Sequence, residues 1–216
     1  MKKLISIIFT LLLGTSCAYA AAEPTFLVNW NASQAQVENW INFQTLYYKD
    51  SNIGGDWLAD KEEIYIENLT VCREPEGYTG KAALISHYAV LFGKKADIMY
   101  DVFNDQLTCT QIMLLNETAS NEIGMPDYNE YLQKIEAEII SKMDNPRFIS
   151  TPTGDLAQGE SGLIEFMDDI TYACIAFSVN NSQNTFELDI ILAPVEYLAY
   201  SMPEKAEKIK EAFGRN

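Results

Sequence analysis

The chain of 216 residues lacks the residue patterns on which most enzyme and metal sites depend. Its single histidine, His87, excludes any site that needs two imidazoles. It has no C-x-x-C pair, no H-E-x-x-H or G-x-S-x-G motif and no glycine-rich phosphate loop. The sequence therefore indicates no catalytic residue, no metal ligand set and no cofactor.

Basic residues are scarce, with 15 Lys and Arg against 31 Asp and Glu, which gives a net charge of −16. This charge repels phosphate backbones and anionic lipid surfaces, so we expect no nucleic-acid partner. Acidic residues spread over the surface serve solubility, whereas acidic residues gathered on one folded face would indicate a cationic partner. Hydrophobic residues make up 48% of the chain, which is enough for a packed core.

Long apolar runs are confined to the N-terminus, where Lys2 and Lys3 precede an apolar run over residues 5–13 and the small residues Ala18 and Ala20. The run is too short to span a bilayer. The pattern predicts a signal peptide over residues 1–20 and a periplasmic or secreted protein with no membrane span. Residues 13–17 also resemble a lipoprotein box, with Gly14 at a usually aliphatic position. In that alternative Cys17 carries a lipid anchor.

Three cysteines remain after the predicted cleavage: Cys72, Cys109 and Cys174. In an oxidising compartment an odd number predicts either one disulfide with a free thiol or three buried thiols. Spacing alone does not fix the pairing. We favour a disulfide between Cys72 and Cys109, because both lie in the first half of the chain.

Apolar residues at three- and four-residue spacing predict two long helices. Ser33 and Gln36 form a capping box before a helix that continues to residue 48, and Asp127 and Glu130 form another before a helix over residues 128–143. Alternating runs predict strands over residues 25–30, 62–72, 83–92, 97–103, 107–115, 146–153, 163–167, 170–179 and 185–192.

A helix followed by about four strands therefore occurs twice, which predicts an α+β fold. We expect tandem modules, each a helix packed on a four-stranded antiparallel sheet, so that the protein has two layers. The first module covers residues 21–125 and the second residues 126–216. We expect both modules to pack as one globular unit.

The run F-L-V-N-W-N-A-S at residues 26–33, with Val37 four residues later, resembles the W-G-x-S helix start of a group of uncharacterised secreted bacterial proteins. Asn31 stands where that group has Gly. Further points of similarity in the same group are Phe92-Gly93, Ile98, Tyr100, Phe103, Leu107 and Tyr128.

The helix-plus-sheet module is also similar to that of the SmpA/BamE envelope lipoproteins. Its tandem form is similar to the secreted β-lactamase inhibitory proteins. These resemblances imply a protein that presents a sheet face or loops to another protein. They supply no catalytic residue for this chain.

The three tryptophans lie in the first third of the chain. We expect Trp30 and Trp40 in the core, because they lie on a strand and a helix face that should meet. Trp57 follows Gly-Gly-Asp in a predicted loop and has no evident core position, so it is the first candidate recognition residue. Tyr78, beside the predicted loop at residues 75–80, is the second.

Three functions remain open. The first is a non-enzymatic role in which the exported protein binds another protein through its sheet face and loops. The second is binding of a small ligand or carbohydrate by the early aromatic residues. The third is a hydrolase without a familiar motif, which would need Cys109 or Cys174 close to His87. Carboxylate pairs such as Asp168-Asp169 are interpreted as solvated loop charges.

Overall fold

The computed structural model describes residues 25–54, 58, 64–73, 78–114, 125–150, 161–180, 185–201 and 206–207. Its labelled helices are α2 (Gln34–Ser51), α4 (Met125–Ser141) and α5 (Val195–Ser201). Its strands are β1 (Tyr65–Arg73), β2 (Tyr78–Leu91), β3 (Lys94–Phe103), β4 (Gln106–Leu114), β5 (Arg147–Ser150), β6 (Gly162–Met167), β7 (Thr171–Asn180) and β8 (Thr185–Pro194).

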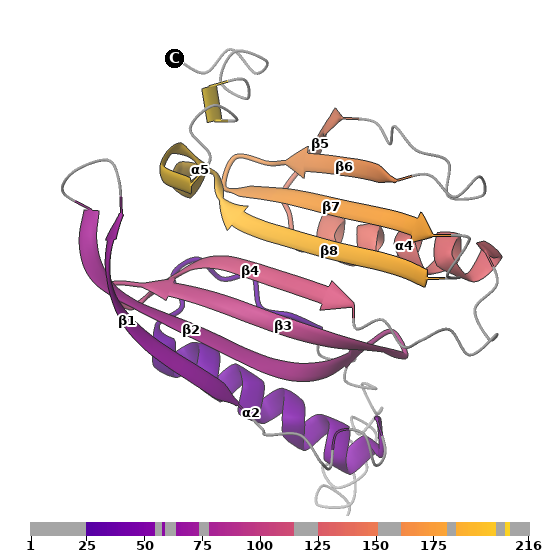
Figure 1. The fold of residues 1–216 in the computed structure, drawn as a ribbon, viewed down its shortest axis with the longest axis horizontal. Helices are drawn as coiled ribbons and strands as arrows, with labels where there is room; N and C mark the ends of the chain where they lie inside the picture. Colours follow the sequence, from indigo (N-terminus) through magenta and orange to yellow (C-terminus); the bar gives the residue numbers. More distant parts are fainter. Residues whose placement is uncertain are drawn as a thin grey trace, which may run out of the picture.

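All eight strands belong to one antiparallel sheet with the order β1-β2-β3-β4-β8-β7-β6-β5 (Figure 1). The first four strands are neighbours in chain order, and β4 then pairs with β8, where Ile112 lies opposite Ile190. The fold is therefore α+β and dominated by its sheet, as the alternating patterns predict. The two halves of the chain contribute to one continuous sheet.

The predicted strands between residues 62 and 192 are confirmed, with shifted ends. The largest shift is in β2, which begins at Tyr78 and not at residue 83. Asn104 and Asp105 have φ angles of 50° and 61° and form the tight turn between β3 and β4. The prediction of a strand over residues 25–30 is wrong, because this segment joins none of the sheet's ladders.

The helix boundaries depend on capping at their N-termini. The predicted capping box of α2 is confirmed, because the Ser33 side chain accepts a hydrogen bond from the Gln36 backbone and the Gln36 side chain accepts one from Ser33. Asn52 ends α2 in the left-handed conformation. α4 already includes Met125, so Asp127 lies inside the helix and is not its N-cap.

Both long helices pack on the same face of the sheet, so the protein has two layers (Figure 1). Val37 and Ile41 of α2 and Ile135 and Ile139 of α4 are fully buried in one core cluster with side chains from both halves of the sheet. Side chains alternate between the two faces along each strand. Every second strand residue therefore faces this core, while the residues between them face away.

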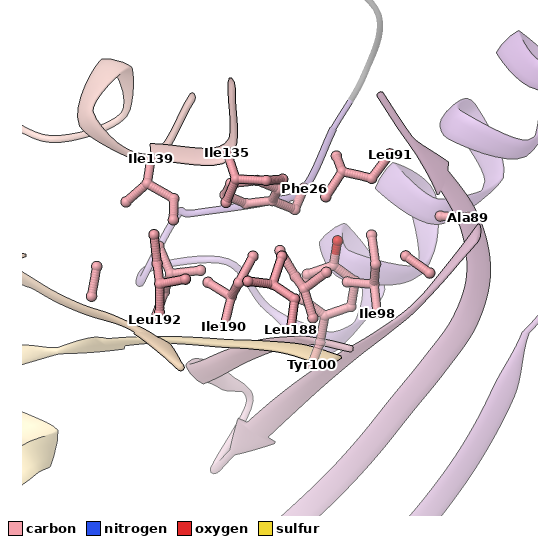
Figure 2. Close-up of a cluster of buried hydrophobic side chains, with 14 of the residues drawn as sticks. Phe26, Ala89, Leu91, Ile98, Tyr100, Ile135, Ile139, Leu188, Ile190 and Leu192 are labelled. Atoms are coloured by element: carbon pink, nitrogen blue, oxygen red, sulfur yellow. The ribbon is translucent and has the colours of Figure 1, made fainter. Parts of the chain in front are cut away.

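The segment of residues 25–32 runs through the core at the point where the two halves meet. Figure 2 shows Phe26 between Ile135 and Ile139 of α4 and the side chains of the sheet. Phe26 is 1% exposed. The Lys142 ammonium lies 4.9 Å from the centre of its ring, which adds a cation–π contact.

Hydrogen bonds fix this segment to the first half of the sheet. The backbone N–H of Leu27 donates to the Tyr100 hydroxyl of β3 at 3.3 Å. The Thr110 hydroxyl of β4 donates to the Leu27 carbonyl at 2.9 Å. These side chains satisfy backbone groups that no sheet ladder pairs, which lets an irregular segment lie inside the protein.

The same segment is also bonded to the second half. The Trp30 indole N–H donates to the Thr171 hydroxyl at the start of β7, at 2.8 Å, and this contact is buried. The Thr25 hydroxyl donates to the Glu138 carboxylate of α4 at 2.5 Å. Trp30 is buried, as the sequence predicts, but it lies between the halves and not on a strand.

We predict that Phe26→Ala lowers the free energy of unfolding by about 3–5 kcal/mol, because it leaves a cavity between α4 and the sheet. Urea unfolding followed by tryptophan fluorescence measures this loss. Phe43→Ala is the matched control, because Phe43 is 51% exposed on α2, and it should cost less than about 1 kcal/mol. Equal losses in both variants would contradict the role assigned to Phe26.

Candidate functional site

The sheet face opposite α2 and α4 carries the strand residues that alternate with the core, and we call it the open face. The register places Tyr88, Asp97, Met113, Asp189 and Ala176 in one row across five neighbouring strands. Antiparallel sheets commonly pack one face on a core and leave the other to solvent or to a partner.

Apolar side chains on the open face remain accessible. Tyr65, Leu69 and Tyr88 are 53%, 46% and 36% exposed, respectively. The half-buried apolar residues on this face include Leu84, Met99, Met113, Leu163 and Ile191. Accessible apolar side chains gathered on one surface are typical of a site that binds another molecule.

Carboxylates lie between these apolar side chains. They are Glu67, Asp97, Asp101, Glu187 and Asp189. Burial raises the pKa of Asp97, because the charged form loses hydration. A cationic group brought beside Asp97 by a partner would stabilise the ionised form.

Neutral side chains hold two of these carboxylates in place. The Gln111 amide donates to both oxygens of Asp189, at 3.0 and 3.3 Å. The Ser178 hydroxyl donates to Glu187 at 3.1 Å. Neutral donors orient a carboxylate without cancelling its charge.

One corner of the open face is covered by α5. Leu198 of α5 packs with Met167 and Tyr172 in a small second core cluster. The Tyr172 hydroxyl donates to the buried Glu165 carboxylate. Burial raises the pKa of the Tyr172 phenol, and the hydrogen bond to Glu165 raises it further. The sequence pattern did not single out this pair, because a lone Glu in an apolar strand carries no signal of its partner.

His87 lies on the helix side of the sheet and is 3% exposed. Its ring stacks on Tyr100 with centroids 5.9 Å apart and planes 6° apart. Burial lowers the pKa of His87 from 6.5 to about 4, and the hydrogen bond with the Tyr88 backbone opposes this shift. The imidazole is therefore neutral at pH 7.

The structure separates His87 from both cysteines of the hydrolase hypothesis. Cys109 precedes the buried Thr110, and Cys174 lies between the buried Ala173 and Ile175, so both thiols point to the open face. The sheet itself lies between them and the imidazole. A cysteine–histidine pair of this kind is therefore not formed.

The residues that the sequence singled out for recognition fall mostly outside the described part. Trp57 and the lipidation candidate Cys17 lie outside the described residues. The backbone of Tyr78 starts β2 opposite Arg73 and is not in a loop, while its side chain lies outside the described part. Trp40 is half-buried on α2, with its ring 5.9 Å from that of Phe43.

The predicted disulfide between Cys72 and Cys109 is incompatible with the strand order. Cys72 lies on β1 and Cys109 on β4, with β2 and β3 between them. Adjacent strands lie about 4.8 Å apart, so the two backbones are separated by roughly 14 Å. A disulfide needs Cα atoms within about 7 Å of each other.

Asp168 is not a solvated loop charge, as the sequence interpretation had it. It is 6% exposed and accepts hydrogen bonds from the backbone N–H groups of Asp144, Ile170 and Thr171. It thus joins the β6–β7 turn to the end of α4. Its neighbour Asp169 is exposed and lies 3.7 Å from the Arg147 guanidinium.

Comparison with known proteins gives no relative from which a function could be transferred. No protein-family model, curated protein or solved structure matches this chain. Among the described residues, no group of three or more His, Cys, Asp and Glu side chains is placed to hold a metal ion. No helix in the described ranges has both the length and the apolar character needed to cross a bilayer.

We predict that His87 makes the protein less stable in acid. His87 is protonated only near pH 4 in the folded state, whereas it is protonated near pH 6.5 in the unfolded chain. Stability therefore falls as the pH falls through this interval. The loss between pH 7.5 and pH 4.5 should be about 2–3 kcal/mol. Urea unfolding of the wild type and of His87→Leu at both pH values measures it. The same pH dependence in both proteins would contradict the prediction.

Proposed function

We propose that this is an exported protein of the cell envelope or exterior that binds a basic protein partner through the open face of its sheet. The proposal of export rests on the N-terminal signal pattern. The observation that carries the proposal of binding is the composition of the open face, which combines accessible Tyr65, Leu69 and Tyr88 with the carboxylates of β3 and β8, and places Tyr88 opposite Asp97.

The negative charge of the protein and of its open face favours a basic partner. The chain carries a net charge of −16. Outside the corner that α5 covers, the described part of the open face holds five carboxylates, one of which, Asp97, is partly desolvated. Complementary charge speeds encounter and excludes acidic partners. Apolar side chains between the carboxylates add the burial that a stable complex needs. A partner surface of lysine or arginine residues around apolar side chains fits both features.

We also infer that the protein arose as two fused modules, each a helix followed by four strands. Two observations support this. The order of a long helix and then four strands occurs twice in the chain. The strand order of the sheet reads the same from either end if β1 to β4 are matched with β5 to β8. The fusion places one open face across both modules.

Neutralising two carboxylates tests whether the open face binds a basic partner. We expect an amphipathic lysine–leucine helical peptide of about 18 residues to bind the protein in low salt. Asp97→Asn with Asp189→Asn should weaken this binding about fivefold, because two charge contacts are lost while the side-chain shapes are kept. Isothermal titration calorimetry measures the affinity.

The matched control is Asp50→Asn with Glu130→Gln, which changes the net charge equally at exposed positions on α2 and α4. It should weaken binding less than about twofold. Equal weakening by both pairs would mean that the peptide senses net charge alone, and the open face would lose its assigned role.

A further inference from the structure

The two edge strands of the sheet, β1 and β5, differ in length and in the regularity of their pairing. Among the described strands, β1 has β2 as its one neighbour and β5 has β6. An edge strand leaves a row of backbone N–H and C=O groups available to another strand. β5 has four residues and a register shift between Phe148 and Ser150. β1 has nine residues in unbroken register with β2, from Tyr65 opposite Ser86 to Arg73 opposite Tyr78.

Among the described residues, the β1 edge shows few of the features that usually prevent strand addition. Natural edges are protected by lysine, proline, bulges or a covering element. β1 contains no lysine and no proline, and its ladder has no bulge. Tyr65 and Leu69 are exposed on the open face, and Ile66 is 38% exposed on the opposite face. β1 thus carries accessible apolar side chains on both faces, with Glu67 and Asn68 between them.

A surface hollow of about 520 Å³ adjoins this edge. Its lining combines Asn68 and Leu69 of β1 and Ala82, Ala83 and Val102 of β2 and β3 with the polar side chains of Gln34, Lys81 and Asp105. The hollow has room for a large apolar side chain carried by a strand that lies along β1.

We propose that β1 accepts an extended segment of another protein, with alternating apolar and basic residues, as a ninth strand of the sheet. The segment's backbone pairs with the β1 edge. Its apolar side chains lie on the helix side of the sheet, where they cover Ile66 and reach the hollow, and its basic side chains lie on the open face beside Glu67. This mode of recognition takes its affinity from main-chain hydrogen bonds and its specificity from alternate side chains. It differs from binding across the open face, because the segment's backbone pairs with the edge of the sheet.

Charge favours a basic segment over a second copy of this chain. Glu67 on β1 and Asp101 on β3 lie in one row of the sheet on either side of Leu84, so carboxylates adjoin the edge. A second copy would bring the same carboxylates and a net charge of −16 against this edge. Alternating lysine or arginine residues would instead meet opposite charge.

The test uses a nine-residue peptide of alternating lysine and valine with blocked ends, added to the full chain. Amide hydrogen exchange followed by NMR should slow in β1 on peptide addition, and it should stay unchanged in β5. Ile66→Lys with Leu69→Lys should weaken peptide binding at least tenfold, through repulsion and lost burial. Phe43→Lys with Leu46→Lys is the control, because both residues are exposed apolar positions on α2, and it should change binding less than twofold.

Each other outcome overturns the proposal. Slowed exchange in β3, β4 and β8 without β1 would assign the peptide to the open face and leave the proposed function standing. If exchange in β1 slows as the protein concentration rises in the absence of peptide, the occupant of the edge is a second copy of this chain. No slowing in β1 at millimolar peptide would mean that the edge does not accept a strand.

Discussion

The structure depends on residues 25–32, which lie between the two halves of the chain and contact both. Phe26 fills the core between α4 and the sheet, and Trp30 bonds to Thr171 at the start of β7. Leu27 is meanwhile held by Tyr100 and Thr110 of the first half. Without this segment, the helix layer would have a gap at the centre of the sheet. A buried aromatic residue at such a junction contributes several kcal/mol, which is a large part of a domain's net stability.

This arrangement determines which surfaces are left for binding. Because α2, α4 and the N-terminal segment all lie on one face, the other face of the sheet and the β1 edge are left uncovered by them and carry accessible apolar side chains such as Tyr65 and Leu69. The same layering keeps His87 on the opposite side of the sheet from Cys109 and Cys174. The described outer surfaces offer apolar contact, backbone pairing and negative charge, which supports the proposed binding of a partner.

Local patterns predicted much of this fold. The capping pair Ser33 and Gln36 predicts the start of α2. The Asn104-Asp105 turn predicts the β3–β4 hairpin, and the spacing of Ile135 and Ile139 predicts the face that α4 buries. The pairing of segments that are distant in the sequence left no such signal. An extended apolar run such as residues 25–30 looks the same whether it joins a sheet or lies beneath a helix. The distance between Cys72 and Cys109 likewise follows from strand order, which spacing along the chain does not encode. The bond between Tyr172 and Glu165 depends on the register of the β6–β7 hairpin.

The most direct test of the role of this segment is a double-mutant cycle between Trp30 and Thr171. Trp30→Phe and Thr171→Val each remove one partner of the buried hydrogen bond, and urea unfolding of the two single variants and the double variant gives their coupling. The structure predicts a coupling energy of about 1 kcal/mol, because the second substitution costs little once the bond is gone. Strictly additive losses would mean that Trp30 does not join the two halves in solution, and would contradict this account of the fold.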